Sequence, residues 1–117
     1  MKEGPIVRKS IDFAISILHY SILLTGKKQF IVSNQLLKSG TSIGANVFEA
    51  QYAESRIDFI HKMKIASKEA SETMYWLTLC QKMDDFEVPP QTLSDLREIQ
   101  AILSGIIITS KKNLKGS

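Results

Sequence analysis

A chain of 117 residues, 44% of them apolar, is long enough to bury one hydrophobic core and short enough to form a single domain over residues 1–117. Its net charge of +3, from 15 Lys and Arg against 12 Asp and Glu, is milder than the imbalance of strongly basic nucleic-acid-binding domains. The single cysteine, Cys80, excludes a disulfide framework within the chain, and its apolar neighbours Leu77 and Leu79 favour a buried thiol.

The chain shows no signal-peptide pattern. Its most apolar stretch, residues 11–24, is interrupted by Asp12, Ser16 and His19 and is too short to span a bilayer. We therefore expect a cytoplasmic protein that does not enter a membrane.

Apolar residues recur with helical spacing and predict four helices, over residues 6–25, 32–53, 55–83 and 90–112. The loops between them are short, which forces successive helices to run antiparallel. The sequence therefore predicts an all-α, up-down-up-down four-helix bundle.

Local signals mark the ends of these helices. Pro5 suits a first helical turn, and Gly26 is a natural stop. Ser55, followed three residues later by Asp58, has the spacing of a capping box. The pair Pro89-Pro90 separates the last two predicted helices.

The second predicted helix is unusually rich in small residues. Gly40 and Gly44 each cost roughly 1 kcal/mol against alanine in a helix interior. A helix that tolerates this cost usually gains the close approach of a neighbour. Asn46 shares a face with Ile43 and Ala50. We expect Gly40, Gly44 and Asn46 to lie at a tightly packed centre.

The apolar faces are wider than a solitary bundle needs. A lone bundle requires a stripe of roughly 100° per helix, whereas apolar residues occupy most positions of residues 11–24 and more than one face of residues 93–108. Because exposed apolar patches generally mark interfaces, we expect a homo-oligomer.

The residues offer no enzyme signature. His19 and His61 form no metal-binding pair, and phosphate-binding glycine loops and nucleophile elbows are absent. Glu49, Glu69 and Glu72 lack the Glu-x-x-His pairs of di-metal bundles. We expect no catalytic residue, metal or cofactor. We interpret these glutamates as part of a polar cluster that fixes the core register, in which Glu69 or Glu72 accepts a hydrogen bond from Asn46, Thr73 or Tyr75.

Aromatic residues also fit a structural role. We interpret Phe59, Tyr75 and Trp76 as core or interface anchors, which leaves Tyr52 near Arg56 as the candidate for base stacking.

The basic residues carry the functional hypothesis: Lys38, Arg56, Lys62, Lys64 and Lys68. If symmetry repeats this weak patch around an oligomer, the combined positive charge would attract the backbone of a polyanion. The affinity of such binding would depend on salt.

One segment also carries a family resemblance. Residues 33–50, continued by Ser55, Asp58-Phe59, Ile65-Ala66, Lys68-Glu69-Ala70, Glu72-Thr73 and Tyr75-Trp76-Leu77, resemble the bacterial four-helix-bundle family encoded in intervening sequences of 23S ribosomal RNA genes. Accessory proteins of diversity-generating retroelements are related to that family. The resemblance implies a closed homo-oligomeric ring, a pentamer, and suggests a non-catalytic accessory or scaffold protein that binds RNA or DNA. The alternative is a protein–protein scaffold that binds no nucleic acid.

Overall fold

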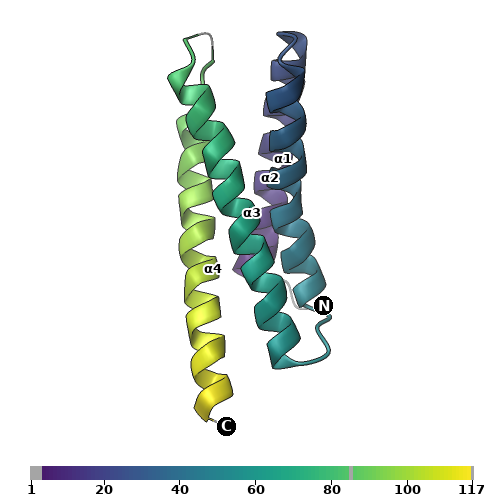
Figure 1. The fold of residues 1–117 in the computed structure, drawn as a ribbon, viewed down its shortest axis with the longest axis vertical. Coiled ribbons are helices and arrows are strands. Elements are labelled where there is room, and N and C mark those ends of the chain that lie inside the picture. Colours follow the sequence, from purple (N-terminus) through teal and green to yellow (C-terminus); the bar gives the residue numbers. More distant parts are fainter. Residues whose placement is uncertain (1–3, 85, 117) are drawn as a thin grey trace.

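The computed structural model describes residues 4–84 and 86–116, and these residues form the expected bundle. The helices are α1 (Pro5–Gly26), α2 (Phe30–Ala50), α3 (Arg56–Lys82) and α4 (Pro90–Gly116). They run along the long axis of a body of 52 × 23 × 20 Å (Figure 1). α2 ends three residues before the predicted boundary, and α4 continues four residues beyond it.

Each helix packs against the next one in the chain, and α4 returns to contact α1 less extensively. The backbones of α1 and α3 do not approach one another among the described residues, so these two helices occupy diagonal positions of the bundle. None of the helices in the described part of the chain has both the length and the apolarity needed to cross a membrane.

The ends of the helices confirm the local sequence signals. Pro5 begins α1, and the chain leaves Gly26 through Lys28, which adopts a positive φ of 63°. The Asp58 amide donates to Ser55 Oγ at 3.0 Å, and Asp58 Oδ2 accepts from the Glu54 amide at 3.2 Å. Ser55 therefore caps α3 as predicted.

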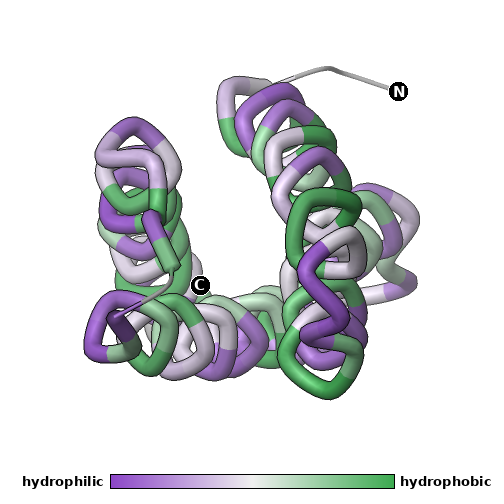
Figure 2. Tube along the Cα trace, turned by 90° about the horizontal axis from the view of Figure 1, so that it is seen from above, coloured by the Kyte–Doolittle hydropathy of each residue, from purple (hydrophilic) through white to green (hydrophobic). Residues whose placement is uncertain are grey.

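The core contains buried apolar side chains from all four helices, such as Phe13, Leu36, Leu77 and Leu96. Buried apolar area of this kind supplies most of the stability of a small bundle. Apolar positions also lie on the outward side of the helices, as the end-on view shows (Figure 2).

The small residues of α2 bring it close to α1. A methyl group added at Gly40 would lie 2.9 Å from both Cγ1 and Cγ2 of Ile17, a distance that real side chains do not tolerate. Further along, an added methyl group at Gly44 would lie 3.4 Å from the carbonyl oxygen of Ser10. The predicted close approach is confirmed, and it is tightest at Gly40.

Serine and threonine hydroxyls provide the buried polar contacts between helices. Ser33 Oγ donates to the carbonyl of Ser21 at 2.9 Å, which links α2 to α1. Thr73 Oγ1 lies 3.0 Å from Ser39 Oγ, which links α3 to α2. Such contacts specify register because an unpaired buried hydroxyl is costly.

We predict that Gly40→Ala destabilises the protein. Overpacking a buried site costs about 1–3 kcal/mol, which outweighs the roughly 1 kcal/mol that alanine gains over glycine in a helix. Gly105→Ala is the matched control, since an added methyl group there has no neighbour within 4 Å. Urea denaturation should show a lower free energy of unfolding for Gly40→Ala and a higher one for Gly105→Ala. A Gly40→Ala protein as stable as its parent would contradict the close α1–α2 contact.

Candidate nucleic-acid interface

The outward side of α3 carries a line of basic side chains. His61, Lys64 and Lys68 are exposed and follow one another at spacings of three and four residues, so they share one face of the helix. The buried residues Met63 and Ala70 lie on the other side of α3 and pack into the core. The bundle therefore directs this line of positive charge into solvent.

Lys64 and Lys68 have no ion pair or hydrogen bond with another residue in the part of the chain that the structure describes. Lys62 differs, because its Nζ lies 4.0 Å from Glu49 Oε1 on α2. A surface pair at this distance contributes little to stability, but it partly neutralises the lysine. Lys64 and Lys68 are therefore the basic residues best placed to meet an anionic ligand.

The other predicted basic residues lie apart from this pair. Lys38 is exposed on α2, and Arg56 is exposed in the first turn of α3, offset around the helix from Lys64. The structure thus brings Lys64 and Lys68 together with His61, and leaves Lys38, Arg56 and Lys62 as separate charges.

Tyr75, interpreted from the sequence as a core or interface anchor, is not part of the core, since the residue is 59% exposed in this chain. Tyr75 follows Lys68 by seven residues and precedes Lys82 by seven, so it lies on the same outward face. The seven-residue spacing of His61, Lys68, Tyr75 and Lys82 is the sequence pattern that indicates this shared face. We name the set His61, Lys64, Lys68, Tyr75 and Lys82 the α3 stripe.

Other aromatic residues lie as expected. Phe59 and Trp76 are partly buried and pack against the core. Tyr52, the expected stacking candidate, is exposed and lies beside Phe48 with ring centroids 6.0 Å apart.

The expected polar cluster of glutamates is not assembled in the single chain. Glu49 and Glu72 are exposed, and Glu69 is half-buried. Asn46 Nδ2 donates to the carbonyl of Ser42 in its own helix, at 2.9 Å. The hydroxyl of Thr73 lies near Ser39 and near the backbone carbonyl of Glu69, at 2.8 Å, rather than near a carboxylate. Uncharged hydroxyls take this role because their burial costs far less than that of a carboxylate.

No group of three potential metal ligands forms among residues 4–84 and 86–116.

Cys80 is fully buried, as the sequence predicted, beside Tyr20. Burial raises the pKa of the Cys80 thiol above its usual value. The site is therefore unsuited to thiolate chemistry.

We predict that Cys80 reacts slowly with Ellman's reagent in the native protein at pH 8. Its thiol is buried and held in the protonated form, whereas the thiolate is the reactive species. Addition of denaturant should release the full reactivity of one thiol per chain. Rapid native labelling, at the rate of a free thiol, would show that this end of the core is open.

A second surface lies on α1. Ile11, Ile15, Leu18 and Ile22 are between 42% and 70% exposed and follow one another at spacings of four, three and four residues. We name these four residues the α1 stripe. Next to it, a groove between α1 and α2 is lined by Leu18, Ile22 and Leu37 together with Ser21, Thr25, Ser33 and Asn34. Because α1 and α3 are diagonal in the bundle, the α1 stripe and the α3 stripe face in different directions.

Comparison with known proteins gives these features a family. The 23S rRNA-intervening sequence proteins match residues 2–105. A crystal structure from Bacteroides thetaiotaomicron, of a protein with unknown function from the S23 ribosomal protein family, is 43% identical. The match covers 87% of this chain and 97% of that chain, with a TM-score of 0.79. No curated protein matches this chain. The chain belongs to the 23S rRNA-intervening sequence protein family, and its four-helix fold agrees with the resemblance in residues 33–77.

Proposed function

We propose that this protein is a non-catalytic accessory or scaffold protein that binds the phosphate backbone of RNA or DNA through α3. The observation that carries this proposal is the pair Lys64 and Lys68, exposed on one helix face and unpaired among the described residues. Two lysines one turn apart lie about 6 Å apart along the helix axis, so they can contact phosphates of the same strand.

The proposed binding is electrostatic and insensitive to base sequence. Lysine–phosphate contacts release condensed counterions, and the affinity consequently falls as salt is added. They position a nucleic acid without reading its bases. The matched family is named for 23S rRNA, so a structured RNA is the first ligand to test.

We also propose that copies of the chain associate through the α1 stripe into a closed ring, the pentamer that the family resemblance implies. An apolar stripe that follows a helical repeat over more than two turns is suited to packing against another helix. Each added copy would present another α3 stripe, and several weak contacts on one ligand raise the overall affinity.

A second candidate function is a scaffold for another protein, without nucleic acid. The extent of exposed apolar surface on α1, including Ile22 at 70% exposure, favours this alternative. In that case, the α1 stripe and its groove would receive the partner, and the charges of α3 would contribute solubility alone.

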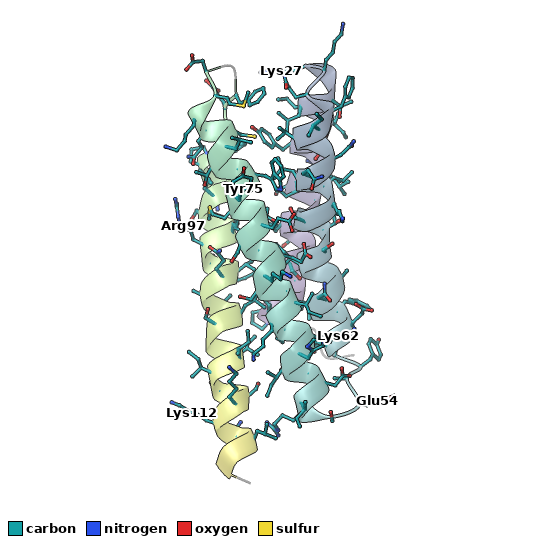
Figure 3. All side chains as sticks on the ribbon, viewed as in Figure 1. Lys27, Glu54, Lys62, Tyr75, Arg97 and Lys112 are labelled. Carbon is teal, nitrogen blue, oxygen red and sulfur yellow. The ribbon has the colours of Figure 1, made fainter. Side chains whose placement is uncertain are left out.

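We predict that the double variant Lys64→Glu/Lys68→Glu loses RNA binding and keeps its fold, because both side chains are exposed. Arg97→Glu/Lys112→Glu is the matched control, since it changes net charge equally on α4, where both side chains project away from α3 (Figure 3). Fluorescence anisotropy over a salt series should show at least a ten-fold weaker affinity and a shallower salt slope for the α3 variant only. If both variants weaken RNA binding equally, a general effect of net charge explains the binding and the α3 site is wrong.

We predict that Ile15→Glu/Ile22→Glu converts the oligomer to a monomer. Burying two carboxylates in an apolar contact is strongly unfavourable, while in the single chain both side chains are already solvated. Light scattering after size-exclusion chromatography should report the smaller mass, and circular dichroism should remain helical. Ile108→Glu on α4, where the side chain is also exposed, serves as the control. A monomeric parent protein would remove the proposed ring.

A further inference from the structure

The geometry points to a single-stranded nucleic acid as the ligand of the α3 stripe, with an unpaired base stacked on Tyr75 and phosphates held by Lys64 and Lys68. This inference rests on the proposed nucleic-acid binding and narrows it, from any polyanion to a strand with accessible bases. It assigns Tyr75 as the residue that distinguishes single strands from duplexes.

Basic and aromatic groups follow one another along α3 in an order that suits a single strand. His61, Lys68, Tyr75 and Lys82 recur every seven residues, and Lys64 lies one turn before Lys68. The line extends for about 30 Å at the helical rise of 1.5 Å per residue. Cationic groups therefore flank the aromatic ring on both sides. Proteins that bind single strands combine a positive track with exposed aromatic rings in this way.

Tyr75 is held in place by its neighbour Trp76. Its ring contacts Trp76 in a T-shaped arrangement, with centroids 5.0 Å apart and planes at 78°. Trp76 in turn packs against the core. The indole therefore supports one part of the phenol ring, and the exposed 59% of the residue leaves area for another π system. An aromatic ring that is supported but largely uncovered can stack on a base with little loss of conformational freedom.

Two competing occupants fit the α3 stripe less well: a duplex and a copy of the chain related by a two-fold axis. In a duplex, both faces of each base are already stacked inside the helix, so Tyr75 would find no partner there. A second copy of the chain packed symmetrically against this stripe would bring Lys64 and Lys68 close to the same lysines, and like charges repel. Glu72 is exposed at the edge of the α3 stripe, and its single negative charge does not cancel the positive charges of the lysines there. A strand that offers phosphates and unstacked bases satisfies both kinds of group.

The test uses Trp76, the single tryptophan of the chain, as an internal reporter beside Tyr75. Oligo(dT) and a DNA duplex of equal length are titrated into the full-length protein, with binding followed by anisotropy of a labelled strand and by Trp76 emission. Tyr75→Ala, Tyr75→Phe and Lys64→Glu/Lys68→Glu are compared. Light scattering verifies that each variant keeps the oligomeric state of its parent.

We expect oligo(dT) to change Trp76 emission, and Tyr75→Ala to weaken oligo(dT) binding by about ten-fold, because stacking of one base is typically of that order. Tyr75→Phe should retain the affinity, since phenylalanine keeps the π face, and duplex binding should be equal in all three Tyr75 forms.

Two binding results would overturn the inference while leaving the proposed function intact. One is unchanged oligo(dT) affinity in Tyr75→Ala when the lysine variant has lost binding, and the other is an equal loss of duplex and single-strand binding in Tyr75→Ala. A changed oligomer mass in Tyr75→Ala would assign Tyr75 to self-association and also overturn it. Absence of binding to both DNAs and to structured RNA at low salt would remove the proposed function itself.

Discussion

The close approach of α2 to α1 is the constraint on which the rest of the bundle depends. Gly40 leaves room for the side chain of Ile17, and the reciprocal contacts of Ser21 and Ser33 fix the register one step further along. A larger side chain at position 40 would force the two helices apart. Because α2 also packs against α3, through Ser39 and Thr73, the position of α2 beside α1 also determines where α3 lies.

This arrangement separates two surfaces of different chemistry. α1 and α3 are diagonal, so the apolar α1 stripe and the basic α3 stripe cannot merge into one patch. A protein built in this way can associate through one side and keep the other open. In the proposed function, the α1 stripe serves assembly and the α3 stripe serves nucleic-acid binding. Variants of α1 should therefore change assembly, and variants of α3 should change binding.

The sequence predicted the helices, their caps, the buried Cys80 and the tight centre of α2, because each depends on local spacing or on small residues that have few alternative roles. It did not predict the exposure of Tyr75. A large aromatic residue beside Trp76 suggested a core or interface anchor, and only the rotation of α3 within the bundle decides which of two adjacent residues faces the core. The glutamate cluster is not assembled within the single chain for a related reason: Thr73 pairs with Ser39 across α2 and α3 at a lower desolvation cost than a carboxylate would incur. Periodicity also could not distinguish Lys62, which turns toward Glu49, from Lys64, which has no partner among the described residues.

The central claim is that α3 is the side of the molecule that meets a nucleic acid. Lysine acetylation followed by mass spectrometry, with and without a structured RNA, tests this claim most directly because it locates the protected side chains. The account predicts that RNA protects Lys64 and Lys68 and leaves Lys112, exposed on α4, as reactive as in the free protein. If RNA changes the reactivity of none of the three lysines, or protects Lys112 alone, the claim is contradicted.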